Sequence, residues 1–308
     1  MTPERAFDIL VAGEINPDLV LTGNVRPEFG QVEQLVDSAR LTIGSSSAIF
    51  ACGAARLGLK VGFIGICGDD LFGRFMLDEL RRRAVDVSAV IVDPAVPTGL
   101  SVILSTPGDR AILTHAGGID RLRAGQVTDE LLSRSRHLHV ASYFLQTALQ
   151  PGLPELFRRA HALGLTVSLD PNWDPSGKWA GFDELLPRVD VFLPNQNEAL
   201  ALTGERTVEP ALARLAEKCA WVAVKLGRDG ALARNTVGTL RVPALKIQAA
   251  DTTGAGDSFD AGFLYGFLNG WSLERSLRLA AACGSLSTRQ AGGTDAQATL
   301  EEALRHVD

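Results

Sequence analysis

The sequence has few cysteines, and it has no long run of apolar or like-charged residues. Only four of its 308 residues are cysteine, no two of them form a C-x-x-C pair, and all have apolar or small neighbours: Cys52, Cys67, Cys219 and Cys283. This pattern predicts buried free thiols and argues against a disulfide framework or a cysteine metal site. Because no apolar run reaches membrane-spanning length, we also expect no membrane partner.

Charge and short motifs exclude further classes of protein. The formal net charge is −6, and the densest basic run, 81–83, falls where a helix is expected to end. The helix dipole explains that run, so we expect no nucleic-acid partner. No G-x-x-x-x-G-K-[ST] motif is present, and Gly62, Gly65 and Gly68 lack the G-x-G-x-x-G spacing, which argues against a P-loop kinase and a Rossmann dehydrogenase. Residues 1–7 are charged and contain no apolar signal-peptide segment, so we expect a cytoplasmic protein.

Short apolar segments alternate with amphipathic segments of helix length, which is typical of a mostly parallel sheet covered by helices. The expected strands are 8–12, 61–65, 166–170, 189–193 and 221–226. The expected helices are 46–57, 70–83, 153–163, 211–218, 256–269 and 272–288. We therefore expect one α/β domain over residues 1–308, with a central mostly parallel sheet flanked by helices.

Two segments, 14–41 and 98–114, interrupt this alternation, because neither contains a stretch of helix length. Both show strand-like alternation, and Pro107, Gly108 and Asp109 form a good turn sequence. We expect both segments to leave the same edge of the central sheet and to pair as a small β-sheet lid.

The strongest functional signal is the stretch 251–263, DTTGAGDSFDAGF. A Gly-Ala-Gly run (Gly254, Ala255 and Gly256) that enters a helix leaves backbone N–H groups aimed at one point, which suits a phosphate or a developing negative charge. Asp257 then lies at the helix N-terminus, where its carboxylate is stabilised and can accept a proton from a substrate hydroxyl. The stretch therefore indicates an enzyme that binds phosphate and uses Asp257 as a base.

This stretch resembles the C-terminal signature of the ribokinase-like (PfkB-type) carbohydrate kinases, and the resemblance extends over essentially the whole chain. It implies the ribokinase-like fold, with ATP and Mg²⁺ as cofactors and a primary hydroxyl of a small sugar as the phosphate acceptor. It also implies that carbonyl groups near Asp251, Thr253 and the loop 287–293 could bind K⁺.

The resemblance assigns substrate binding to residues after the first expected strand and at the start of the first expected helix. Asn16 and Asp18 match a segment that binds sugar hydroxyls, although an Asn-Pro-Asp turn would also explain them. Gly44 and Ser45 match the N-terminal Gly-Gly signature, of which only the first glycine is kept, and a serine helix cap is the alternative. Ile49 stands where the family has a substrate-binding asparagine, which leaves the substrate open.

Further matches concern the metal and the nucleotide. Asn195 and Glu198 match an N-x-x-E element that in this family helps to place Mg²⁺, largely through water, while a helix cap by Asn195 is the alternative. Asp174 stands where related segments often have an arginine, which favours a neutral substrate. The remaining matches imply contacts with ATP: Lys225, Gly227, Gly230 and Gly256, and Cys283 within an adenine wall at 281–285.

Three functions fit these residues. A sugar kinase is the first, and a nucleoside kinase of the same fold, with an apolar base pocket near Ile49 and the lid, is the second. The third is an inactive ligand-binding homologue, against which the retained Asp257, Asn195 and Glu198 count. One face of a small lid covers the substrate and leaves the other face in need of cover, so we also expect a homodimer through the lids.

Overall fold

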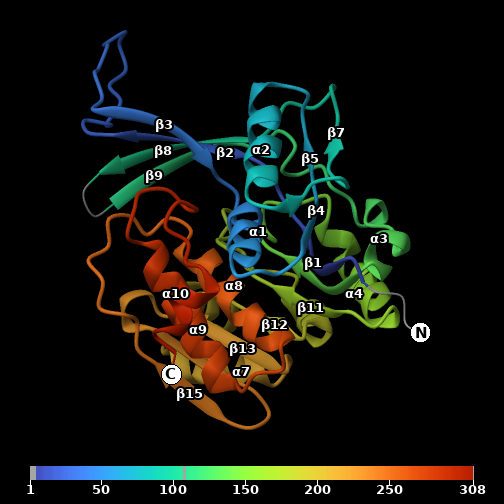
Figure 1. The fold of residues 1–308 in the computed structure, drawn as a ribbon. Helices are drawn as coiled ribbons and strands as arrows, with labels where there is room; N and C mark the ends of the chain where they lie inside the picture. Colours follow the sequence, from blue (N-terminus) through green and yellow to red (C-terminus); the bar gives the residue numbers. More distant parts are fainter. Residues whose placement is uncertain (1–4, 107–108, 308) are drawn as a thin grey trace.

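The structure is a computed structural model that describes residues 5–106 and 109–307. Its largest element is a nine-stranded sheet of order β15-β14-β13-β12-β11-β10-β1-β4-β6. Neighbouring strands from β6 to β13 pair in parallel, and β14 and β15 add an antiparallel edge (Figure 1). The strands of this sheet are β1 (Phe7–Ala12), β4 (Val61–Ile64), β6 (Val85–Asp86), β10 (Ser135–Val140), β11 (Thr166–Leu169), β12 (Val191–Phe192), β13 (Trp221–Lys225), β14 (Ala231–Arg234) and β15 (Thr239–Val242).

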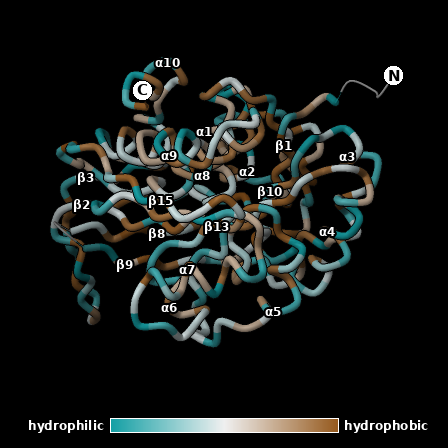
Figure 2. The backbone as a smooth tube through the Cα atoms, turned by 90° about the horizontal axis from the view of Figure 1, so that it is seen from below, coloured by the Kyte–Doolittle hydropathy of each residue, from teal (hydrophilic) through white to brown (hydrophobic). Residues whose placement is uncertain are grey.

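Helices cover both faces of this sheet, and each face has its own hydrophobic core. One core includes residues of α1 (Ser46–Arg56), α2 (Leu71–Arg82), α8 (Ala255–Leu268), α9 (Leu273–Ser287) and α10 (Leu300–Leu304). The other includes residues of α3 (Asp129–Ser133), α4 (Leu153–Ala162), α5 (Phe182–Leu185), α6 (Gln196–Thr203) and α7 (Val208–Ala216). Hydrophobic segments accordingly run through the middle of the molecule in Figure 2. Strands covered on both faces need continuous apolar sequence, which is why their pattern is readable.

The predicted mostly parallel sheet with flanking helices is confirmed, and the differences concern individual strands. The segment expected as a strand at 189–193 pairs only over β12. Strand β10 was not among the expected strands, and it carries His137 and His139. Both rings are buried, and the hydroxyl of Ser168 bonds His137 Nε2 at 2.6 Å and His139 Nδ1 at 2.7 Å. A polar pair is thus accommodated inside the sheet.

A second sheet of order β3-β2-β8-β9 comes from the two segments predicted as a lid. Its strands are β2 (Pro17–Thr22), β3 (Ser38–Ile43), β8 (Leu100–Thr106) and β9 (Asp109–His115). The parallel pair β2–β8 forms the middle, and the sheet extends from one edge of the body at the upper left of Figure 1. The predicted turn includes Pro107 and Gly108, which lie outside the described residues. Two short strands, β5 (Ile66–Cys67) and β7 (Ile91–Val92), form a third sheet.

The parallel arrangement determines where a site can form. The chain continues from β1 to β4 on one side of β1 and later returns to β10 on its other side. In open α/β sheets, ligands bind at the carboxyl ends of the strands beside such a reversal. The second sheet begins at this edge, directly after β1, so the segments predicted as a lid lie where a ligand is expected to bind.

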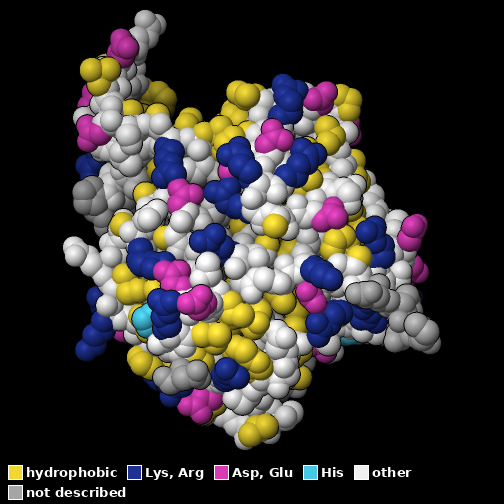
Figure 3. Space-filling view, in the orientation of Figure 1, with side chains coloured by type: hydrophobic (Ala, Val, Ile, Leu, Met, Phe, Trp, Pro, Cys, Tyr) yellow, Lys and Arg dark blue, Asp and Glu magenta, His cyan; other side chains and the backbone are white. Residues whose placement is uncertain are grey.

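Other expectations from composition have clear outcomes. All four cysteines are buried and free, as predicted. Arg81 and Arg82 lie in the last turn of α2, as expected for a favourable helix-dipole contact. Positive and negative side chains are interspersed on the face shown in Figure 3. Within the described ranges, no helix has both the length and the apolar character needed to cross a bilayer.

Candidate active site

A cavity of about 1060 Å³ lies at the carboxyl edge of the sheet, between the lid and the N-terminus of α8. Its wall contains most of the residues singled out in the sequence: Asn16, Asp18, Ser45, Ile49, Asn195, Glu198, Lys225, Gly227, Gly230, Thr253, Gly254, Ala255, Gly256 and Asp257. The fold therefore brings the predicted substrate, phosphate and nucleotide residues to one place.

Two of the predicted residues, Gly44 and Cys283, are not part of the cavity wall. A Cβ on Gly44 would lie 2.1 Å from Asp18 Oδ1, so the glycine leaves room for that carboxylate. Cys283 is buried between helices, where a Cβ on Gly262 would approach its Sγ to 3.0 Å. Its side chain faces α8, and the cavity wall at α9 is formed by Ala281, Gly284, Ser285 and Thr288, so the predicted contact of Cys283 with ATP stays a prediction.

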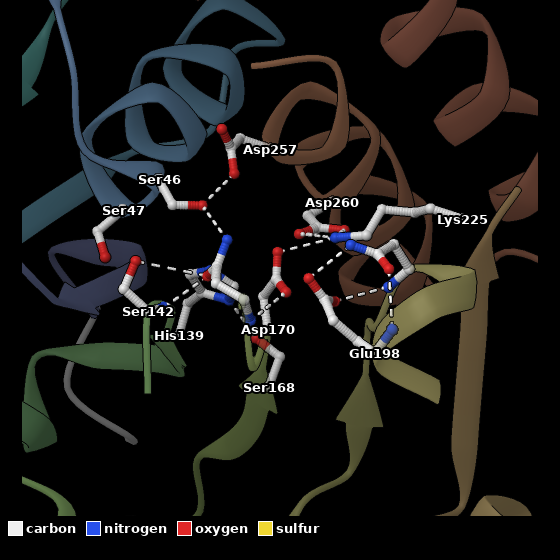
Figure 4. Close-up of polar contacts among 12 residues, drawn as sticks. Ser46, Ser47, His139, Ser142, Ser168, Asp170, Glu198, Lys225, Asp257 and Asp260 are labelled. Carbon is white, nitrogen blue, oxygen red and sulfur yellow. Dashed lines mark hydrogen bonds and ion pairs between the residues drawn. The ribbon is translucent and has the colours of Figure 1, made fainter. Parts of the chain in front are cut away.

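Asp257 lies in the first turn of α8, with its side chain buried at the cavity wall. The hydroxyl of Ser46 donates a hydrogen bond to Asp257 Oδ1, and Figure 4 shows the two side chains pointing toward each other. Burial, together with the negative charge of Asp170, raises the pKa of Asp257 to about 7. A carboxyl group that titrates near neutrality can take up a proton from a hydroxyl and release it again.

The turn before Asp257 depends on glycine. Gly254 is the N-cap of α8 with φ +71°, a left-handed conformation that favours glycine. A Cβ there would also lie 2.8 Å from Ile49 Cγ2 and 2.8 Å from Gly293 Cα. The first N–H groups of a 14-residue helix have no partner within the helix, and they carry its positive dipole end. The turn therefore places these N–H groups beside Asp257, an arrangement that suits an anion, and we call residues 254–256 the anion turn.

A chain of polar contacts connects Asp257 to residues that the sequence reasoning missed. Ser46 Oγ accepts a hydrogen bond of 3.0 Å from Asn172 Nδ2, and Asn172 Oδ1 accepts one of 2.7 Å from Ser142 N. The hydroxyl of Ser142 donates to Glu14 Oε1 at 2.8 Å. Glu14 in turn accepts bonds from Ser47 N at 3.1 Å and Ser47 Oγ at 2.5 Å, at the start of α1. The network fixes α1 against the ends of β1, β10 and β11.

Three of the six non-glycine residues with positive φ in the described part of the chain lie in or beside this network. Ser45, Ser142 and Asn172 have φ values of +67°, +51° and +53°, which non-glycine residues rarely adopt. Such conformations cost about 1–3 kcal/mol each and cluster at functional sites. The signal available in the sequence was positional, because Glu14, Ser142 and Asn172 all follow parallel strands.

The part of the cavity beside the starts of β2 and β8 contains the residues predicted to bind the substrate, and we call it the substrate end. Its polar groups, at the root of the second sheet, are those of Asn16, Asp18 and Ser101. Asn16 Nδ2 donates to Ser101 Oγ at 3.3 Å and lies 3.5 Å from Asp18 Oδ1. Burial raises the pKa of Asp18 to about 7, although the positive charge of Arg110 opposes the rise. Ser45 Oγ accepts from Ala48 N at 3.0 Å and so caps α1, as the alternative reading of the serines predicted.

Ile49 and its neighbours form an apolar wall of the cavity. The Ile49 side chain is buried beside Gly254 and Gly293 and contributes to the cavity wall. Four further apolar side chains line the substrate end: Ile103, Ile112, Ile119 and Leu145. The structure thus places an apolar surface next to the polar groups of Asn16 and Asp18.

Asn195 and Glu198 form a reciprocal cap at the start of α6. Asn195 Oδ1 accepts from Glu198 N at 3.0 Å, and Glu198 Oε2 accepts from Asn195 N at 2.8 Å. The helix-cap reading is therefore correct, and the pair also lines the cavity. Burial, and then the negative charge of Asp170, raises the pKa of Glu198 to about 7. A cation near Glu198 would relieve this unfavourable burial of charge.

Lys225 lies in a buried cluster of carboxylates. Its Nζ bonds Asp170 Oδ2 at 2.8 Å and Asp260 Oδ2 at 3.1 Å, as Figure 4 shows. Burial disfavours the charged amine, but the two carboxylates raise the pKa of Lys225 above its usual value. The predicted contact of Lys225 with ATP stays a prediction, since its ammonium group is already bound to carboxylates.

The same cluster is a suitable environment for a metal ion. Carboxylate oxygens of Asp170, Asp257 and Asp260 lie within 4.8 Å of one another. With Glu198, four carboxyl groups share one ammonium group, so ionised carboxylates would outnumber the cation. Oxygen ligands with excess negative charge are what Mg²⁺ prefers. The residues present therefore fit a Mg²⁺ ion.

The remaining predicted residues have structural roles that the geometry explains. Gly227 and Gly230 have φ values of +59° and +91°, and a Cβ on Gly230 would lie 2.0 Å from Val242 O. Asp251 accepts hydrogen bonds from Thr253 N and from Gly292 N, both at 2.9 Å. It therefore ties the anion turn to the loop after α9, around the position predicted for K⁺.

A mostly parallel sheet, a β lid and a helix N-terminus beside a buried aspartate define a kinase of the ribokinase-like class. Residues 6–300 match the family model described as "pfkB family carbohydrate kinase". The ATP-dependent ribose-1-phosphate kinase of Halopiger xanaduensis is 32% identical over 292 residues, which cover 94% of each chain. The chain belongs to the pfkB family of carbohydrate kinases.

Solved structures agree with this assignment. The crystal structure of a candidate ribokinase II from E. coli in complex with ATP and Mg²⁺ has a TM-score of 0.86 and 25% identity, and the match covers 98% of this chain and 99% of that one. Adenosine kinase from Sinorhizobium meliloti has a TM-score of 0.86 and 26% identity, with coverage of 98% and 100%. The predicted ribokinase-like fold is confirmed.

Proposed function

We propose that the protein transfers the γ-phosphoryl group of ATP to a primary hydroxyl of a small sugar-like molecule, with Asp257 as the catalytic base. The observation that supports this best is the position of Asp257. Its buried carboxylate lies in the first turn of α8, beside the glycine anion turn and in the wall of the cavity under the lid. The group that accepts the proton therefore lies both beside the proposed phosphate site and in the wall of the pocket for the sugar.

The residues of the chain divide the work of phosphoryl transfer, which needs alignment and charge stabilisation more than covalent chemistry. Asn16 and Asp18 hold hydroxyl groups of the acceptor, and Asp257 takes the proton of the attacking hydroxyl. The N–H groups of Gly254–Gly256 stabilise negative charge on the transferred group. Glu198 and Asn195, with Asp170 nearby, would hold Mg²⁺, largely through water. When bound, Mg²⁺ neutralises charge on the ATP phosphates.

The apolar wall of Ile49, Ile103, Ile112, Ile119 and Leu145 supports a nucleoside as the second candidate acceptor. The polar groups at the lid root would bind the ribose, and the apolar side chains would contact the base. The similar proteins support both a sugar and a nucleoside as the acceptor, because they include a ribose-1-phosphate kinase and an adenosine kinase. An inactive binding protein is the least favoured reading, since Asp257, Asn195 and Glu198 are all retained and line one cavity.

Activity assays with Asp257→Asn test this proposal. We expect the wild type with Mg²⁺ and ATP to phosphorylate at least one member of a panel of sugars and nucleosides. Asp257→Asn keeps the size of the side chain and removes the proton acceptor, so kcat should fall by about 10²–10⁴-fold while ATP binding persists. Turnover of the variant within threefold of the wild type would refute the role of Asp257. A wild type inactive on the entire panel would count against the kinase proposal itself.

We further propose that K⁺ binds below the anion turn. Asp251 and Thr253 are joined there to the loop after α9 through Gly292, so an ion at their carbonyl groups would order the turn. Equal rates in K⁺ and in a bulky organic cation would exclude activation.

A homodimer through the lids is a further proposal, and the outer face of the lid supports it. Side chains that alternate with the cavity-facing ones are apolar and partly or fully exposed: Leu19, Leu21, Leu41, Val102, Leu104 and Leu113. A second copy would cover this face. Light scattering at micromolar concentration tests it, with Leu113→Glu expected to give a monomer.

We also propose that residues 1–308 work as one domain with the four-stranded sheet as its lid, because the cavity is shared between that sheet and the body. The cytoplasmic location stays a prediction from the sequence, to be checked by cell fractionation.

A further inference from the structure

The inner face of the lid presents three rows of side chains to the cavity. Alternate residues of a strand share a face, so the paired residues of β8 and β9 define the rows: Ser101 with Thr114, Ile103 with Ile112, and Ser105 with Arg110. The face changes from polar at the lid root, through apolar, to cationic at Arg110. Nothing in the catalytic arrangement above uses that cation.

Arg110 connects the lid to the anion turn. Its side chain lines the cavity, and its Nη1 donates a hydrogen bond of 2.7 Å to Thr253 Oγ1. The Thr253 hydroxyl donates to Asp251 Oδ1 at 2.8 Å, so toward Arg110 it acts as the acceptor. Because Thr253 directly precedes Gly254, the N-cap of α8, the guanidinium lies beside the N–H groups proposed to bind phosphate.

The guanidinium has capacity for a further ligand. Arginine carries five N–H donors, and among the residues of the described ranges the bond to Thr253 is the one hydrogen bond that this guanidinium donates. Its planar donors match two oxygens of a phosphate group better than a single hydroxyl does. The hydroxyl of Thr253 therefore holds the group at the cavity wall and leaves its other donors available for a ligand.

The charges around the cavity favour an anion as that ligand. Glu14 and Asp18 bring carboxyl groups to the substrate end, and Asp257 adds a third beside the turn at the start of α8. The ammonium group of Lys225 already forms ion pairs with Asp170 and Asp260. A phosphate that approaches this end would meet repulsion unless a cation opposes it, and Arg110 is positioned to do so.

We propose that Arg110 binds a phosphate oxygen in the complex of enzyme, nucleotide and acceptor, and this proposal rests on the proposed kinase function. The phosphate has two possible sources, namely the phosphoryl group in transfer and a phosphate carried by the acceptor. In both cases the guanidinium completes an anion site whose other half is the N-terminus of α8. The same positive charge would favour acceptors that already carry a phosphate.

Kinetics with two classes of acceptor distinguish the sources. The variants are Arg110→Met, Arg110→Lys and the control Arg26→Met, an exposed arginine of the lid hairpin that does not line the cavity. Neutral acceptors are ribose, fructose and adenosine, and phosphorylated acceptors are ribose 1-phosphate and fructose 1-phosphate. Each variant is assayed for kcat and KM at saturating Mg²⁺ and ATP.

A contact with the phosphoryl group in transfer predicts that Arg110→Met lowers kcat by about 10²-fold on every acceptor, with KM nearly constant. A contact with an acceptor phosphate predicts a tenfold or larger rise in KM for phosphorylated acceptors alone. Arg110→Lys should recover part of either loss, because it keeps the charge and loses the planar donors. Constants within twofold of the wild type on all acceptors would overturn the proposal.

Binding of inorganic phosphate tests Arg110 even if no acceptor in the panel is phosphorylated. Calorimetric titration should show that Arg110→Met weakens phosphate binding at least threefold, whereas Arg26→Met leaves it unchanged. Equal affinities of the wild type and Arg110→Met would overturn the proposal. Failure of the kinase function would instead appear as a wild type that binds phosphate and phosphorylates nothing.

Discussion

The phosphate end and the substrate end of the cavity achieve their geometry in different ways. At the phosphate end, left-handed backbone falls on glycines, Gly227, Gly230 and Gly254, where it costs little. At the substrate end it falls on Ser45 and two other non-glycine residues, each at about 1–3 kcal/mol. The phosphate end thus relies on backbone that glycine makes available, whereas the substrate end is held in strained conformations by side-chain contacts.

The two ends also differ in how they treat charge. The phosphate end has a buried cluster in which Lys225 is enclosed by carboxylates. The substrate end has serines, isoleucines and the amides of Asn16 and Asn172, with Glu14 and Asp18 as its carboxyl groups. The proposed nucleotide would be the same for every acceptor, so the phosphate end can be built into the core. Exchangeable side chains at the other end allow the acceptor to change without loss of the fold.

Replacing Lys225 should have the largest effect on stability. Lys225→Met leaves Asp170 and Asp260 buried without their cation, and breaking a buried ion pair in this way costs about 3–5 kcal/mol. Lys218→Met removes an exposed pair with Asp183, and such pairs contribute about 0–1 kcal/mol. Denaturant unfolding of both variants gives the comparison. Similar losses would show that the buried cluster is not the stability element that its contacts indicate.

Gly254→Ala tests whether the anion turn needs glycine for space as well as for conformation. Gly270→Ala is the matched control, because Gly270 has φ +69° with open space around its Cβ position, while a Cβ on Gly254 would meet Gly293 and Ile49. Both variants carry left-handed strain of about 1–2 kcal/mol. Gly254→Ala should lose about 1–3 kcal/mol more through overpacking, and it alone should lose activity. Equal melting temperatures and equal rates would show that the turn tolerates a side chain.

The pH dependence of kcat/KM compares one carboxylate from each end. Burial raises the pKa of both Asp257 and Asp18 to about 7. A base must be deprotonated, so kcat/KM should be constant above pH 7 and fall about tenfold per pH unit below it. If Asp18 must also be ionised to accept a hydroxyl bond, the slope approaches two, and Asp18→Asn returns it to one. A profile that is flat from pH 5 to 8 would contradict the base assignment.

The phosphate end could be predicted from the sequence because it is local. The stretch 251–263 contains the anion turn, the base and the helix start, and the structure keeps them together at the N-terminus of α8. Glu14, Ser142 and Asn172 could not be predicted in the same way. Their contacts join segments more than 100 positions apart in the chain, such as Glu14 with Ser142. Only the order of the strands in the sheet brings these residues together. One of those strands, β10, was not among the expected strands.

Contacts between distant segments also explain why the sequence could not determine the surroundings of the Lys225 and Cys283 side chains. Both belong to segments that resemble nucleotide-binding elements, so a contact with ATP was a reasonable expectation. The side chain of Cys283 points to Gly262, and that of Lys225 points to two aspartates on other elements. A motif fixes the path of the backbone, but the direction of a side chain depends on partners that the motif does not contain.

Ile49 gives the smallest expected effect and bears most directly on the acceptor. Its side chain is buried between the anion turn and the cavity, so it touches both ends of the site. An apolar group cannot satisfy a buried hydroxyl, and an unpaired polar group costs about 1–3 kcal/mol. An acceptor that presents a hydroxyl there should therefore be disfavoured by roughly tenfold, at about 1.4 kcal/mol per decade. Deoxysugars and nucleosides present an apolar edge and avoid that cost.

Ile49→Asn should reverse this preference by improving kcat/KM for ribose and fructose, relative to deoxyribose and adenosine, by roughly tenfold. Ile49→Val is the control, since it trims the side chain, stays apolar and should keep the ranking. The measurement is kcat/KM over the whole panel, because a loss common to all acceptors would report damage to the anion turn instead. If Ile49→Asn left the ranking of the acceptors by kcat/KM unchanged, the side chain at position 49 would pack against Gly254 without contacting the acceptor. Recognition would then rest on Asn16, Asp18 and the lid.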